Sequence, residues 1–117
     1  MIEASCHCGA VRIAAPFAPE AVTSCNCSLC RRSGWLCAYY NPRDVAVHGE
    51  TEVYVWGDRT LAIHRCKVCG CGTHWSAMDA ALDRMGVNAR LMAPEILAAA
   101  RVRRFDGAES WTFFDED

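Results

Sequence analysis

The sequence predicts a mostly β domain of short antiparallel strands, held together by clusters of metal-binding cysteines. Apolar and polar residues alternate with a period of two in several short segments that end at glycine or proline, which is typical of short strands. Eight of the nine cysteines fall into three tight groups, at 6–8, 25–30 and 66–71. A chain of 117 residues is expected to form one domain, over residues 1–117, with a modest core that a bound metal would stabilise.

The expected strands follow one another with turn residues between them. They are expected at 11–13, 36–40, 45–47, 53–55, 61–63, 102–105 and 111–114. Pro42 and Gly49 end the second and third strands, and Asp106 and Gly107 form a turn before the last. One short helix is expected at about 94–100, because proline suits the first turn of a helix. The last residues, Asp115, Glu116 and Asp117, have the composition of a solvated tail.

The cysteines are expected to bind metal rather than to form disulfides. Their number is odd, so that at least one thiol would be left unpaired in a disulfide framework. Residues 1–4 do not resemble the basic start of a signal peptide, and we therefore expect a reducing, cytoplasmic setting. In that setting clustered cysteines indicate metal binding or catalysis.

The overall charge argues against two classes of partner. The net charge is −2 and the pI about 6.0, so that no general basic field attracts phosphates, and a nucleic-acid partner is not expected. No apolar run approaches the roughly 20 residues that a membrane helix needs, and a membrane partner is not expected either.

Two of the cysteine groups are expected to form one structural zinc site. Cys66 and Cys69 are followed by Gly70, which permits a tight turn whose backbone amides can donate to the thiolates. Cys6 and Cys8 supply two further sulfurs. Four thiolates complete the tetrahedron of a structural zinc site and leave no position for a substrate.

The remaining group differs because it offers three sulfurs within six residues and no obvious fourth ligand. Its members are Cys25, Cys27 and Cys30. Three protein ligands and one exchangeable position are typical of catalytic zinc. The alternative is a second structural site whose fourth ligand comes from elsewhere in the chain, with candidates Cys37, Cys71 and His74. Cys37 also lies in an apolar segment, where it is interpreted as a small buried residue.

Taken together, three sequence blocks resemble the glutathione-dependent formaldehyde-activating family, which also includes centromere protein V. The blocks are Cys6-His-Cys-Gly-Ala-Val, Cys25-Asn-Cys-Ser-Leu-Cys-Arg-Arg-Ser-Gly34 and Cys66-x-x-Cys-Gly-Cys-x-Thr-His74. They occur in the order found in the family, and the resemblance spans residues 5–111. It implies an Mss4-like fold, which is an arrangement of small antiparallel sheets held by zinc–cysteine sites.

The resemblance also implies the ligands and the activity. It assigns the structural zinc to Cys6, Cys8, Cys66 and Cys69, and a second, catalytic zinc to Cys25, Cys27 and Cys30. The activity named for the family is that of S-(hydroxymethyl)glutathione synthase, a carbon–sulfur lyase that joins glutathione to formaldehyde. The expected partners are therefore a small thiol and a small aldehyde.

Three further residues are candidates for the chemistry. His74 is expected to transfer a proton to the oxygen of the adduct, because the pKa range of histidine suits that task. The alternative roles for His74 are a hydrogen bond to a zinc thiolate and a fourth metal ligand. Arg31 and Arg32 follow the open cysteine group and are expected to bind a carboxylate of the thiol, or else to be surface charges.

A second function class is a zinc-stabilised binding module without catalysis. The two classes differ at Cys25, Cys27 and Cys30. An enzyme should have an open metal position beside a pocket, whereas a binding module should have both metals closed, or this cluster empty.

Overall fold

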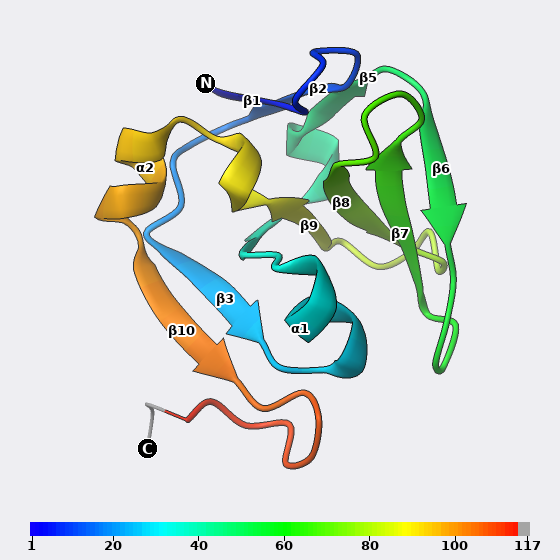
Figure 1. The fold of residues 1–117 in the computed structure, drawn as a ribbon, viewed down its shortest axis with the longest axis vertical. Coiled ribbons are helices and arrows are strands. Elements are labelled where there is room, and N and C mark those ends of the chain that lie inside the picture. Colours follow the sequence, from blue (N-terminus) through cyan, green and yellow to red (C-terminus); the bar gives the residue numbers. More distant parts are fainter. Residues whose placement is uncertain (115–117) are drawn as a thin grey trace.

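The computed structural model describes residues 1–114, which form two β-sheets and several short helices (Figure 1). The small sheet has the order β1-β2-β5, and both of its strand pairs are antiparallel. Its strands are Ile2–Ser5 (β1), Arg12–Ala15 (β2) and Ala46–His48 (β5).

The large sheet has the order β10-β3-β4-β9-β8-β7-β6. Its strands are Ala21–Cys25 (β3), Cys37–Tyr40 (β4), Thr51–Tyr54 (β6), Leu61–Cys66 (β7), Gly72–Ala77 (β8), Met85–Asn88 (β9) and Arg101–Phe105 (β10). All of its neighbouring strands are antiparallel except β10 and β3, which are parallel.

Within residues 1–114, four short helical segments connect the strands. They are α1 (Ser28–Ser33), the 3₁₀ segments η1 (Pro42–Asp44) and η2 (Ala89–Leu91), and α2 (Pro94–Ala99). The expected helix at 94–100 is confirmed as α2, which has proline in its first turn and Glu95 near its N-terminus. The helix α1 was not expected, and it begins inside the second cysteine group, before Cys30. None of the helices in residues 1–114 has the length and apolarity needed to cross a membrane.

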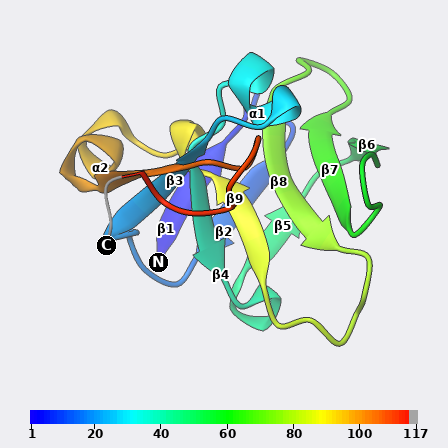
Figure 2. The same ribbon diagram turned by 90° about the horizontal axis from the view of Figure 1, so that it is seen from below.

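The core lies between the two sheets (Figure 2). Ile13 of the small sheet packs in one apolar cluster with Val22, Ala38 and Val87 of the large sheet, and each of these side chains is at most 2% exposed. Directly paired residues of antiparallel strands share a face, and Ala38 pairs with Val87. These residues therefore define the inner face of the large sheet, and the alternating residues between them form its outer face.

The mostly β fold class is confirmed, with three differences in detail. One sheet is larger than the expected small sheets, and it contains one parallel pair, β10 with β3. The expected strand at 111–114 is wrong, since Phe113 forms only an isolated bridge with Phe105. Strands β1, β3, β8 and β9 were not expected. The expected tail at Asp115, Glu116 and Asp117 lies outside the described residues.

Candidate metal centres

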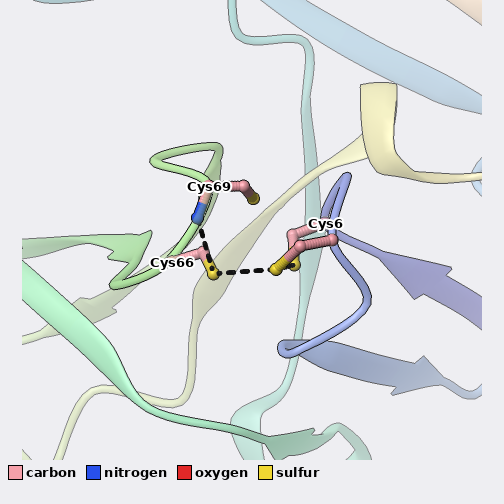
Figure 3. A group of neighbouring side chains, drawn as sticks. Cys6, Cys66 and Cys69 are labelled. Carbon is pink, nitrogen blue, oxygen red and sulfur yellow. Dashed lines mark hydrogen bonds between the residues drawn. The ribbon is translucent and has the colours of Figure 1, made fainter.

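Four cysteines from two turns that are far apart in the sequence meet at one point. Figure 3 labels three of them, Cys6, Cys66 and Cys69. The sulfur atoms of Cys6, Cys8, Cys66 and Cys69 all lie within 4.8 Å of one another. The Cys8 sulfur lies 3.7 Å from that of Cys6 and 3.7 Å from that of Cys66. A tetrahedral zinc with Zn–S bonds of about 2.3 Å would hold its sulfurs about 3.8 Å apart, whereas a disulfide needs about 2 Å. This donor set therefore fits a four-thiolate metal site, which we call the closed cluster.

The closed cluster is built from two tight turns that aim backbone N–H groups at the sulfurs. Val11 N donates to Cys6 Sγ over 3.2 Å, and Val68 N donates to Cys66 Sγ over 3.3 Å. In the second turn the Cys71 N–H holds the pKa of the Cys69 thiol well down, at about 5. Gly70 has a φ of 79°, a conformation that residues with a side chain rarely adopt. Burial opposes ionisation of Cys6, but the hydrogen bonds that its sulfur accepts, first that of the Val11 N–H, lower its pKa. The pKa of Cys8 is instead raised to about 11 despite the hydrogen bond from the Ala10 N–H. The turns therefore favour the thiolate at Cys6 and Cys69.

The second cysteine group also comes together, with its three sulfurs within 4.8 Å of one another. Cys25 ends β3, Cys27 precedes α1, and Cys30 lies in the first turn of that helix. Cys27 is the N-cap, because its sulfur accepts the backbone N–H of Cys30 over 3.3 Å. Burial opposes ionisation of Cys27, but this hydrogen bond lowers its pKa. All three side chains are half-buried, and we call them the open cluster.

Within residues 1–114 no fourth cysteine, histidine or carboxylate joins the open cluster. The three candidates considered for that position, Cys37, Cys71 and His74, belong to neither metal-binding group. The closed and open clusters thus differ in the number of protein ligands they offer. Three thiolates fit a metal with one exchangeable position.

The loop after β10 closes against the open cluster. Asn26 Nδ2 donates to Asp106 Oδ1 over 3.0 Å, and the Ala108 N–H donates to Asn26 Oδ1 over 3.0 Å. Gly107 lies so close that a Cβ at this position would be 2.5 Å from the Cys25 sulfur. Only glycine therefore fits at position 107 beside the Cys25 sulfur. The hydrogen bonds of Asn26 hold the loop that contains Gly107 in this position.

The outer face of the large sheet extends from the open cluster. Cys37 pairs with Thr23, which is two residues before Cys25 on β3, so that the three side chains share this face. Cys37 is buried, which raises the pKa of its thiol to about 11. The structure thus places Cys37 as a small buried residue beside the open cluster. Trp75 pairs with Gly86 and lies on the same face.

His74 lies on the inner face, because it pairs with Val87 and His64. Its ring stacks on that of His64 at 4.0 Å, and its Nδ1 shares a hydrogen bond of 2.9 Å with Thr73 Oγ1. Burial and the neighbouring His64 lower the pKa of His74 to about 4. The structure does not bring this imidazole together with Cys25, which lies on the other face. The predicted proton-transfer role of His74 stays a prediction.

Arg31 and Arg32 lie on α1, directly after the open cluster, and both are exposed. The Arg32 guanidinium donates to the Ser28 carbonyl over 2.8 Å, at the start of its own helix. Tyr39 is one of the aromatic residues expected on a sheet face, and the structure adds Trp75 and Arg84, which were not expected beside it on the outer face. The alternation of side chains along a strand could have indicated that Cys37 and Tyr39 share one face of β4. No local sequence pattern indicates that β4 pairs with β9, or β9 with β8.

Comparison with known proteins identifies a matching family and a similar solved structure. The family model described as "Glutathione-dependent formaldehyde-activating enzyme" matches residues 1–105. A crystal structure of a Rhodobacter sphaeroides protein, a structural genomics target, superposes with a TM-score of 0.70. The two sequences are 29% identical, and the match covers 86% of this chain and 99% of that one. No curated protein matches. The chain belongs to the glutathione-dependent formaldehyde-activating enzyme family.

Proposed function

We propose that the chain is a zinc-dependent carbon–sulfur lyase that joins a small thiol such as glutathione to formaldehyde or another small aldehyde. One observation carries the proposal: Cys25, Cys27 and Cys30 form a half-buried three-cysteine cluster that no fourth ligand closes within residues 1–114. The description of the matched family supports this choice of thiol and aldehyde.

The two clusters would have different tasks. Zinc in the closed cluster would stabilise the fold, since four thiolates saturate its coordination. Zinc in the open cluster would supply a position where a thiol is held as its thiolate at neutral pH. The reaction then forms one sulfur–carbon bond, and the carbonyl group of the aldehyde becomes a hydroxyl group. The proton lost by the thiol balances the charge on that oxygen.

The residues around the open cluster would control its charge and shape. Three thiolates and one zinc ion carry a net negative charge, and Arg31 and Arg32 bring positive charge to the adjacent helix. We propose that Arg31 either offsets this charge or helps to bind the thiol, whereas Arg32 is already engaged with its own helix. His74 is left out of the bond-forming step because it lies on the inner face. A cytoplasmic location would keep these cysteines reduced.

Calorimetric titration of the zinc-loaded protein with glutathione tests the proposal. We expect binding at millimolar glutathione or below for the wild type, and formation of the formaldehyde adduct when formaldehyde is added. The Cys25→Ser variant should lose both properties and keep its fold, because the closed cluster is separate. Absence of any heat of binding at millimolar glutathione would refute the proposal. A wild type whose open cluster takes up no zinc would instead favour a non-catalytic binding module.

A further inference from the structure

Two aromatic rings and one guanidinium form an ordered group on the outer face of the large sheet. The rings of Tyr39 and Trp75 meet edge to face with centroids 6.2 Å apart, and Arg84 Cζ lies 3.9 Å from the centre of the Tyr39 ring. The Trp75 indole lies over Gly86, where an added Cβ would overlap the indole nitrogen. We call Tyr39, Trp75 and Arg84 the aromatic platform.

The platform adjoins the open cluster through Cys37. The Cys37 sulfur lies 2.5 Å from where a Cβ of Gly86 would be, so it contacts the backbone under the Trp75 ring. On its other side Cys37 pairs with Thr23 of β3, the strand that ends at Cys25. A ligand held at Cys25 would therefore adjoin this face.

Arg84 is held in place but lacks a carboxylate partner in the described part of the chain. It is exposed, and within residues 1–114 no carboxylate lies within 4.0 Å of its guanidinium. The adjacent Asp83 pairs instead with Arg43 over 3.3 Å. With its Cζ over the Tyr39 ring, the guanidinium still has N–H groups that can donate to an acceptor beside the ring. This arrangement suits recognition of a carboxylate through two parallel hydrogen bonds.

We propose that Arg84, oriented by Tyr39 and Trp75, binds a carboxylate of the thiol, and that the open cluster therefore selects acidic thiols over neutral ones. This inference rests on the proposed function and adds the residue that determines specificity. A peptide thiol such as glutathione carries its carboxylates several bonds away from its sulfur. A cation on the sheet face beside the open cluster is suited to that separation, and the half-buried Trp75 ring would contact the intervening part of the thiol.

Comparison of glutathione with glutathione dimethyl ester, which keeps the thiol but has no free carboxylate, tests the proposal. In calorimetric titrations of the zinc-loaded wild type we expect glutathione to bind about tenfold to hundredfold more tightly, the effect of one hydrogen-bonded charged group. The Arg84→Gln variant should bind both ligands with nearly equal affinity. Arg84→Lys should keep part of the preference, and the Arg43→Gln control should keep all of it.

A spectroscopic measurement separates binding at this site from a merely structural role of Arg84. In the ¹⁵N-labelled wild type, glutathione should shift the indole N–H resonance of Trp75, which Trp75→Phe identifies. It should leave in place that of Trp56, which follows β6 at the opposite edge of the large sheet from β3. An Arg84→Gln protein with an unchanged preference for glutathione over the ester would overturn the inference. The inference would also be overturned if the Arg31→Gln variant lost the preference for glutathione over the ester and the Arg84→Gln variant kept it. In both cases thiol binding, and with it the proposed function, would stand. A wild type that binds neither ligand would overturn both.

Discussion

The closed and open clusters use the same chemical group in opposite ways. The closed cluster joins Cys8 to Cys66 across a separation of 58 residues, whereas the open cluster draws all its ligands from residues 25–30. A metal bound by distant segments holds the fold together, and one bound by a single loop and helix can be lost without unfolding the rest. The sequence separation of the ligands, as well as their number, therefore indicates whether a metal site is structural or catalytic.

The largest expected effect is that of Cys66→Ser, which removes one ligand of the closed cluster. Structural zinc contributes on the order of 10 kcal/mol of apparent binding free energy at four-cysteine or mixed sites. That value is comparable with the whole stability of a domain of this size. We therefore expect insoluble or unfolded protein, measured by soluble yield, near-ultraviolet circular dichroism and zinc content.

Two other cysteine variants serve as controls for this prediction. Cys25→Ser removes a ligand of the open cluster and should lower the zinc content while thermal unfolding stays close to that of the wild type. Cys71→Ser lies near the closed cluster but outside it, and should keep both metals. A folded, zinc-free Cys66→Ser protein with native thermal stability would contradict the distinction between the two clusters.

His74→Gln should change the pH dependence of stability and leave thiol binding unchanged. The native pKa of His74 is about 4, against an ordinary value of 6.5. Above pH 6.5 the imidazole is neutral in both states. As the pH falls from 6.5 to 4, the unfolded state takes up a proton that the native state does not. The free energy of unfolding then decreases by up to about 3 kcal/mol, at 1.36 kcal/mol per pKa unit, and levels off below pH 4.

Urea unfolding at several pH values, with wild type and variant compared at each, measures this difference. Loss of metal in acid affects both proteins, so the difference between them isolates His74. Parallel pH curves would count against the buried, neutral state of this imidazole. A His74→Gln protein that binds glutathione normally but no longer forms the formaldehyde adduct would restore the proton-transfer role predicted from the sequence.

The smallest expected effect is that of Asn26→Ala, which loosens the loop against the open cluster. The variant loses the hydrogen bonds to Asp106 and Ala108. Groups that orient metal ligands typically contribute about 10- to 100-fold in metal affinity. We expect a loss of this size at the open cluster alone, measured by competition with a fluorescent zinc chelator. Equal weakening of both metals would mean that the two clusters are coupled, contrary to the comparison above.

The sequence predicted the metal-binding groups better than the strands. Cys6, Cys8, Cys66 and Cys69 could be paired in advance because glycine-containing turns and close spacing leave few ways to bring four sulfurs together. Helix 94–100 was also predicted, since proline and glutamate mark its start. Helix α1 was missed because its N-cap is a cysteine, which standard capping patterns do not include.

The rest of the site depends on contacts between distant strands. Tyr39, Trp75 and Arg84 come from β4, β8 and the segment before β9, and only the order of the strands brings them together. His74 illustrates the same limit. Its position in the Cys-Gly-Cys block suggests a place near the metal, whereas the pleat of β8 turns it to the inner face.

The 58-residue separation within the closed cluster has a consequence during synthesis. At about 5–20 residues per second, a ribosome needs about 3 to 12 s to extend the chain from Cys8 to Cys66. The residues of the open cluster emerge together within that interval and can bind metal as soon as they appear. Cys6 and Cys8 must wait with both thiols unprotected until their partners arrive. The nascent chain can therefore bind metal at the open cluster first, although the metal of the closed cluster contributes more to the stability of the finished fold.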